Sequence, residues 1–331
     1  MAGISTMGLY TVIEIWLNES TDPCSRGRVL SVYMLLTYMG MAIGQQLLNV
    51  GSVLGHELFF LVGIFLALCM VPVSVTHSIH PELHKPERFN ILALIRKAPI
   101  GMLGCFTSGL LNSAFHSIGP VFGNQAGLTV TEISWFMTAA IIGGLVLQWP
   151  IGKLSDPFDR TQVLSVLGVS IATISLVMMV ITMDAYILFL IAAGIYGGLI
   201  FTVYPVSVAR AHDLFEPKDV IAVSSVLLLV YGIGASIGPI AAASAMALVN
   251  EPSGFFVYSL LISGVYALLA YVLRKRETLE IVPVSEQVDF IPMRRTSTMA
   301  LQIDPRAEED VYDKNGIRCA THRPGGEKMS R

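Results

Sequence analysis

Long apolar segments alternate along the chain with short polar connections. Nine such segments are expected, over residues 1–16, 29–50, 57–77, 99–122, 132–152, 162–182, 185–208, 220–249 and 254–273. An apolar helix of about 20 residues is long enough to cross a bilayer. The pattern therefore predicts an all-α polytopic membrane protein with about nine transmembrane helices.

Composition supports this class and argues against others. Of the 331 residues, 53% are hydrophobic and only 14% are charged, and the mean hydropathy is +0.66. A soluble domain carries roughly a quarter charged residues. No basic stripe suggests nucleic acid, and the four cysteines show no paired spacing, so we expect packing thiols, no metal site and no cofactor.

The basic residues predict the orientation of the chain. Ten of the 21 Lys and Arg residues follow expected spans 1, 3, 5 and 7, and the other 11 lie in the tail after span 9. The connections after the even-numbered spans hold none. Because basic residues near span ends mark the cytoplasmic side, the N-terminus is predicted outside and the C-terminus inside.

The connection "GKLSDPFDR", Gly152 to Arg160, is one of these short cytoplasmic turns. It resembles the major facilitator superfamily signature G-x-x-x-D-[RK]-x-G-[RK], with Gly152, Asp156 and Arg160 in the first, fifth and ninth places. Pro157 stands where a base is usual and Asp159 where a glycine is usual. The resemblance implies a turn that holds neighbouring helices together, its carboxylate accepting from a helix N-terminus or pairing with an arginine.

Four further stretches resemble the YcaD-type branch of this family. They are "GLYTVIEIWLNES" (8–20), "RGRVLSVYMLLTYMGMAIGQQLLN" (26–49), "FTVYPVSVARAHD" (201–213) and "LLLVYGIGASIGPIAAA" (227–243). The resemblance covers about residues 1–305. It implies two six-helix bundles around a central cavity and secondary active transport of a small solute, with no particular substrate.

An internal repeat agrees with a two-bundle fold. Gly40 and Gly44 match Gly234 and Gly238, so span 2 resembles span 8. In the family's register, the chain then corresponds to helices 4–12, and three N-terminal helices are expected to be absent. The expected organisation is the latter part of the first bundle over 1–78, a cytoplasmic linker over 79–98, a complete second bundle over 99–273, and a disordered cytoplasmic tail over 274–331.

Candidate cavity residues come from the helices that line the cavity in the family, and spans 3, 6 and 9 are expected to face lipid. Ser108, Asn112 and His116 recur every four residues and so share one helix face. Such polar side chains are costly in lipid unless they meet a cavity or a partner, and His116 is suited to carry a coupling proton. Alternatively, Asn112 and His116 form an interhelical hydrogen bond that only holds the bundle.

The other candidates also have two interpretations. Gln45, with Gln46 and Asn49, lies late in span 2 and marks either the cavity or a solvated outer helix end. Tyr204 and Tyr231 either contact a ligand or pack in the core. The glycine pairs Gly40–Gly44 and Gly234–Gly238 let helices approach closely, as either sliding or static seams.

The sequence thus favours a transporter that works by alternating access, with the lipid bilayer and a small solute as partners, and a proton as a candidate coupling ion. It is expected to act as a monomer in the bacterial cytoplasmic (inner) membrane. The alternative is a non-transporting receptor or scaffold derived from a truncated transporter fold. No HExxH, GxSxG or paired intramembrane carboxylates appear, so an enzyme is not expected.

Overall fold

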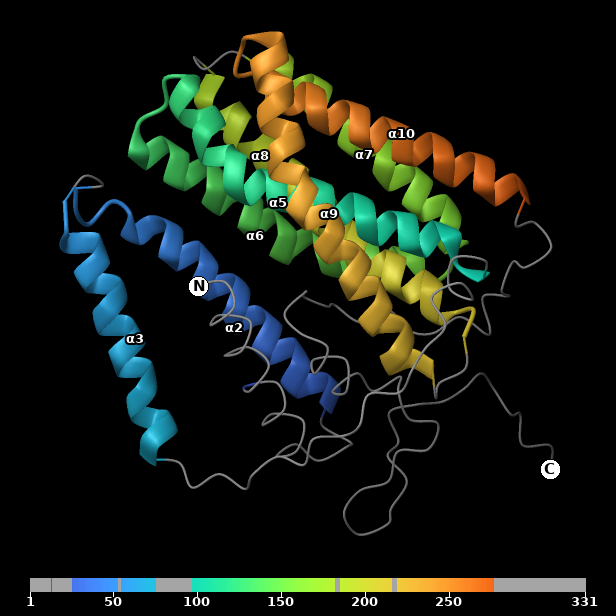
Figure 1. Ribbon diagram of the computed structural model, residues 1–331, viewed down its shortest axis with the longest axis horizontal. Helices are drawn as coiled ribbons and strands as arrows, with labels where there is room; N and C mark the ends of the chain where they lie inside the picture. Colours follow the sequence, from blue (N-terminus) through green and yellow to red (C-terminus); the bar gives the residue numbers. More distant parts are fainter. Residues whose placement is uncertain are drawn as a thin grey trace.

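The computed structural model describes residue 13 and residues 26–52, 55–75, 97–181, 185–215 and 219–276. Within these residues the regular structure consists of eight helices (Figure 1). They are α2 (Arg26–Leu47), α3 (Glu57–Val75), α5 (Pro99–Gln125), α6 (Val130–Ser155), α7 (Arg160–Val180), α8 (Tyr186–His212), α9 (Val220–Val249) and α10 (Gly254–Arg276).

These helices coincide with eight of the nine expected spans, while the first span lies outside the described residues. Five helices, α6 to α10, are long and apolar enough to cross a membrane. Several boundaries differ from expectation, because local hydropathy does not mark where a helix ends. Helix α8 continues to His212, so Arg210, expected in a connection, is a buried helical residue.

Short polar side chains account for where α6 and α7 begin. Thr129 begins α6 with a capping box, in which its Oγ1 accepts from the Glu132 N–H and the Glu132 carboxylate accepts from the Thr129 N–H. Asp159 caps α7 by accepting from the Thr161 N–H at 3.0 Å. In each cap, a short polar side chain accepts a hydrogen bond from an N–H group of the first helical turn, which has no partner within the helix.

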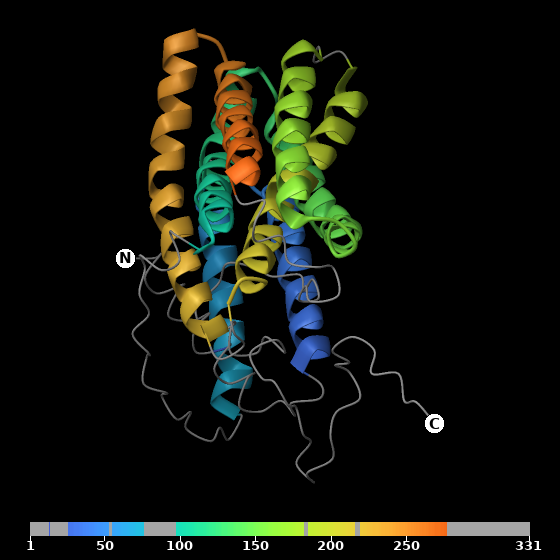
Figure 2. The ribbon, with the colours of Figure 1, turned by 90° about the vertical axis from the view of Figure 1, so that its right-hand side faces the viewer.

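Helix α8 lies at the centre of the packed helices and contacts α5, α6 and α7 (Figures 1 and 2). Every residue from Phe201 to His212 is buried. Around α8, the pairs α5–α9 and α7–α10 pack along their lengths. The second half of α8 therefore has no face toward lipid, which explains why it can hold charged residues.

Aromatic rings fill the core between α5, α6, α8 and α10. Phe122 meets Phe256 edge-on with ring centroids 4.9 Å apart, and Phe136 stacks on Phe189 at 5.3 Å. Such pairs add to the stabilisation that comes from packing alone. The ring cluster lies toward the end of the molecule opposite the α6–α7 turn, because Phe122 is late in α5 and Phe136 early in α6.

Glycines allow α6 and α8 to cross at backbone contact. A Cβ placed on Gly143 would overlap the Gly194 carbonyl, and one on Gly197 would overlap the backbone of Ala140. Helix association in lipid depends on this kind of close approach, since lipid provides no hydrophobic drive between helices.

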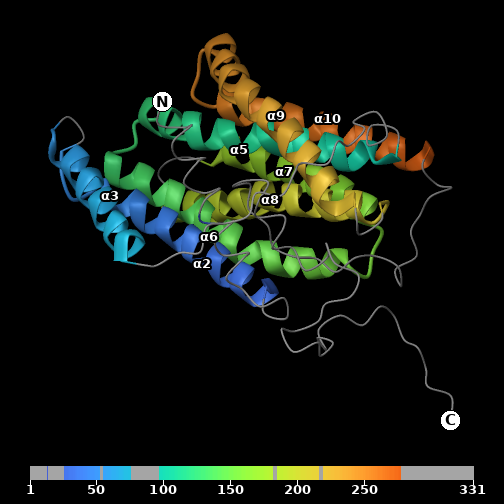
Figure 3. The same cartoon turned by 60° about the horizontal axis from the view of Figure 1, so that its bottom comes forward.

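Helices α2 and α3 lie outside this packed group. Helix α2 runs along α6, whereas α3 stands apart (Figures 1 and 3). Residues 62–71 of α3 are all exposed, including Val62 at 58% and Met70 at 65%. An apolar helix exposed on all sides is suited to lipid, which is where span 3 was expected to lie, and that placement stays a prediction.

We predict that Gly197→Ala lowers the free energy of unfolding by about 1–3 kcal/mol, because the added methyl group forces α6 and α8 apart. SDS titration of the purified protein, followed by circular dichroism, measures this. Gly232→Ala is the matched control, since its Cβ would meet nothing within 4 Å among the described residues. Equal stability of the two variants would contradict the role of this crossing.

Candidate functional site

A buried arginine organises the α6–α7 turn. Arg160, the first residue of α7, is 1% exposed. Its Nη2 donates to Asp156 Oδ1 at 2.8 Å, and its Nη1 donates to Asp213 Oδ1 and to the Ala209 carbonyl, the latter at 3.3 Å. One guanidinium thus connects the end of α6, the start of α7 and the end of α8.

A second, more exposed ion pair extends the cluster to α10. Arg274 Nε donates to Asp159 Oδ2 at 2.9 Å, and its Nη2 donates to Gln162 Oε1 at 3.3 Å. The Asp159 carboxylate therefore both caps α7 and accepts from α10. We call Asp156, Asp159, Arg160, Asp213 and Arg274 the turn cluster.

The two carboxylates of the turn divide the roles that the signature implies for one. Asp156 pairs with Arg160, while the α7 N-terminus is capped by Asp159. Asp159, which stands where the signature has a glycine, is thus the residue that satisfies the helix start. Gly152 is buried and Pro157 is exposed.

Asp213 and Arg274 were not identified from the sequence. Asp213 lies 53 residues from Arg160, and its side chain is 1% exposed. The one feature of the sequence that pointed to Asp213 was its place in the polar run "ARAHD" (209–213), directly after the expected span 185–208. Removing either residue takes an opposite charge away from the other, which is buried, so such a pair is costly to break, although its net contribution to stability is smaller.

Other polar and cationic contacts lie at the same end of the helices. His212 Nε2 and Ser224 Oγ are 2.6 Å apart and join α8 to α9. Lys97 and Lys153 lie over the rings of Phe215 and Trp149, at 4.8 and 4.3 Å from the ring centroids. Cationic side chains thus gather at the end that holds the α6–α7 turn, which we call the basic end.

The three candidate residues of α5 occupy different environments. Ser108 and Asn112 are completely buried, whereas His116 is partly exposed. Asn112 Nδ2 donates to Ser108 O and Oγ, both at 2.7 Å, and to the Ile200 carbonyl of α8 at 3.4 Å. Asn112 Oδ1 is buried and has no hydrogen-bond partner among the described residues.

His116 lies in an aromatic chain that crosses three helices. Its ring stacks on Phe201 of α8, with centroids 5.5 Å apart and planes 15° apart. Phe201 in turn lies 6.4 Å from the ring of Tyr38 on α2. The Phe201 ring thus connects His116 to Tyr38 of α2, the helix that belongs to the first expected bundle.

The polar group late in α2 makes its contact with α6 through Gln46. Gln46 Nε2 donates to Thr138 Oγ1 at 2.7 Å and approaches the Ser134 carbonyl at 3.4 Å. Asn49 Nδ2 donates to Gln46 Oε1 at 3.2 Å. The neighbouring Gln45 is partly exposed.

The remaining candidates lie in packed or open positions. Tyr204 is 2% exposed and meets Tyr231 edge-on, with centroids 5.4 Å apart. Gly234 and Gly238 pack against the α5 backbone at Phe106 and Leu110, where a Cβ would overlap the carbonyls. By contrast, a Cβ on Gly40 or Gly44 would meet nothing within 4 Å among the described residues.

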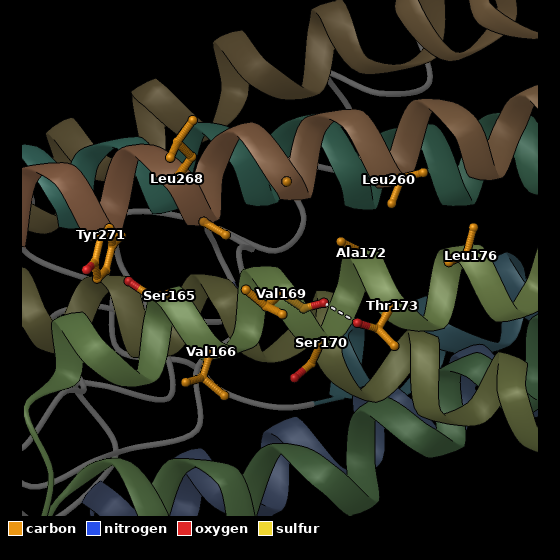
Figure 4. Close-up of a pocket in the computed structure, with 12 residues that line it drawn as sticks. Ser165, Val166, Val169, Ser170, Ala172, Thr173, Leu176, Leu260, Leu268 and Tyr271 are labelled. Atoms are coloured by element: carbon orange, nitrogen blue, oxygen red, sulfur yellow. Dashed lines mark hydrogen bonds between the residues drawn. The ribbon is translucent and has the colours of Figure 1, made fainter.

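A groove of about 620 Å³ runs between α7 and α10 (Figure 4). Its walls are mainly apolar, and two of its hydroxyls, Ser165 Oγ and Thr173 Oγ1, donate to carbonyls of α7 itself at 3.0 and 2.9 Å. These are the helices expected to face lipid, so this groove is separate from the polar face of α5. Among the described residues, no group of three His, Cys, Asp or Glu side chains is placed to hold a metal ion.

Comparison with known proteins adds the family. A model described as Major Facilitator Superfamily matches residues 1–212 and 102–306. The uncharacterized MFS-type transporter YcaD of Escherichia coli O45:K1 is 32% identical over 243 residues, which are 72% of this chain and 62% of that protein. YcaD of Salmonella paratyphi B is 32% identical over 250 residues, or 74% of this chain and 64% of that protein. The chain therefore spans less than two thirds of the length of these relatives.

We predict that Arg160→Met lowers the free energy of unfolding by about 3–5 kcal/mol, because the buried Asp213 carboxylate loses its ion pair with Arg160. The double variant Arg160→Met/Asp213→Leu should regain part of this loss. Arg274→Met is the control, at about 0–1 kcal/mol, because that pair is partly exposed. Equal losses for Arg160→Met and Arg274→Met in SDS titration would contradict the central position of Arg160.

Proposed function

Because the chain belongs to the major facilitator superfamily, we propose that it is a secondary active transporter that moves a small solute across the membrane by alternating access. The observation that carries the proposal is the family match, whose two overlapping ranges extend from residue 1 to residue 306. The relatives named MFS-type transporter support the same class of activity.

The proposed moving parts are the two expected bundles, 1–78 and 99–273, joined by the linker 79–98. The packing of α2 against α6 supports this division, since it is a contact between the two parts. Rocking of two bundles about such contacts alternately exposes a site between them. The turn cluster lies within the second part and supports a role in keeping α6, α7, α8 and α10 together during that movement.

We place the solute path beside the polar face of α5. The buried and unsatisfied Asn112 Oδ1 supports this placement, because a hydrogen-bond donor on a solute would satisfy it. The partly exposed His116 is the proposed proton carrier, next to Phe201 and the α2 ring of Tyr38. One observation supports the alternative, in which these residues only hold helices together: Asn112 Nδ2 donates to the Ile200 carbonyl of α8.

Uptake into proteoliposomes tests the proposal. We expect at least one probe from a panel of radiolabelled amino acids, sugars, dicarboxylates and lipophilic cations to enter faster than into protein-free vesicles, with saturation and with acceleration by the same solute inside. If His116 carries the proton, His116→Asn abolishes accumulation driven by a pH gradient but keeps exchange. Absence of uptake for the whole panel would favour the non-transporting scaffold.

The proposed orientation has its own test. In a chain whose cysteines are replaced by serine, Gln125→Cys at the C-terminal end of α5 should react with a membrane-impermeant maleimide in intact cells. Phe158→Cys in the α6–α7 turn should react only after permeabilisation, since the basic end is proposed to be cytoplasmic. Both positions are exposed. The opposite labelling pattern would reverse the topology.

A further inference from the structure

We infer that Gln46 is a positioning residue that holds α2 against α6 at the end opposite the basic end, and so favours the state in which that end of the α2–α6 seam is closed. This inference rests on the proposed function, because it concerns which end of the transporter is shut. It assigns a role to one side chain that neither the family nor the turn signature specifies.

The spacing on α2 puts Gln46 on the face that meets α6 and α8. Tyr38, Ala42 and Gln46 follow one another at four-residue intervals and therefore lie on one side of the helix. Tyr38 is 5% exposed, and Ala42 packs against the main core cluster. The hydrogen bond to Thr138 thus ends a continuous line of contact along α2.

The contact is polar where the rest of this line is aromatic or apolar. Tyr38 meets Phe201 through its ring, and Ala42 presents a methyl group. Apolar surfaces in lipid separate with little preference for distance, because lipid tails replace the lost contacts. The Gln46–Thr138 bond, at 2.7 Å, has both a required distance and a required direction.

The surroundings orient the Gln46 amide for this bond. Asn49 Nδ2 donates to Gln46 Oε1, so the amide nitrogen is directed to α6. Thr138 is 4% exposed and Ser134 is completely buried, which keeps water away from the acceptors. A side chain that was only solvated at a helix end would need none of these partners.

The position of the bond decides which end of the seam it closes. Ser134 and Thr138 lie in the first turns of α6, which begins at Val130, far from the α6–α7 turn. The Arg26 end of α2 lies away from the packed helices, as the views in Figures 1 and 2 agree. The two helices are therefore held together at one end and apart at the other.

Pulsed EPR distances in nanodiscs provide the test, with the full chain in a cysteine-free background. One spin-label pair, Val50→Cys and Thr131→Cys, reports the Gln46 end of the seam. A second pair, Val32→Cys and Leu154→Cys, reports the basic end. All four positions are exposed. The variants are Gln46→Leu, Thr138→Val and Thr138→Ser, with Gln45→Leu as the matched control of the adjacent residue.

We expect Gln46→Leu to raise the ratio of long to short distances at the Gln46 end by about three- to tenfold, the range for one interhelical hydrogen bond. The basic end should change in the opposite sense, as in a rocking movement. Thr138→Val should reproduce both changes, and combining it with Gln46→Leu should add nothing. Thr138→Ser, which keeps the hydroxyl, and Gln45→Leu should leave both distributions as they are.

Three outcomes would overturn the inference. If Gln46→Leu and Thr138→Val match Gln45→Leu while the unmodified chain shows two distance populations, alternating access stands and the role of Gln46 fails. If the Gln46 end widens without an opposite change at the basic end, the bond is merely structural. If every protein shows one fixed distance at both ends, the proposed rocking fails as well.

Discussion

A bilayer core offers no hydrogen-bond partner to a polar group, so a polar group in a membrane span is costly unless it finds a partner within the protein. The backbone meets this constraint by forming helices. Many hydroxyls meet it by bonding to the carbonyl four residues earlier in their own helix, as Ser113, Thr202, Ser207 and Ser263 do. These side chains are polar, but their hydrogen-bond acceptors lie within the same helix.

The informative polar residues are those whose partners belong to another helix. Arg160 bonds to α8, Arg274 to the start of α7, Gln46 to α6 and His212 to α9. These contacts lie toward the ends of the helices, whereas glycines bring α6 and α8 into backbone contact near their middle. Directional bonds at the ends and close packing in the middle are suited to helices that pivot as groups, because a pivot needs a compact centre and reversible contacts at its ends.

The turn cluster and the Gln46 contact have different consequences for movement. The turn cluster joins α6, α7, α8 and α10, which lie within one expected bundle, and its arginine is buried. Breaking it would separate opposite charges that are buried together, which is costly, so this end of the bundle should move as a unit. The Gln46 contact joins α2 to α6 by one neutral hydrogen bond, which is weak enough to open and close.

Hydropathy, caps and charge depend on residues that are neighbours along the chain, so the sequence was enough to predict eight of the helices and the helix ends at which most basic residues lie. It also identified Asp156 and Arg160, which are close along the chain. The tertiary structure was needed to find that Arg160 meets Asp213, 53 residues away. It likewise decided that Gln46 rather than Gln45 contacts α6, and that His116 stacks on Phe201. The rotation of each helix about its axis selects these partners, and that rotation depends on the packing of all its neighbours at once.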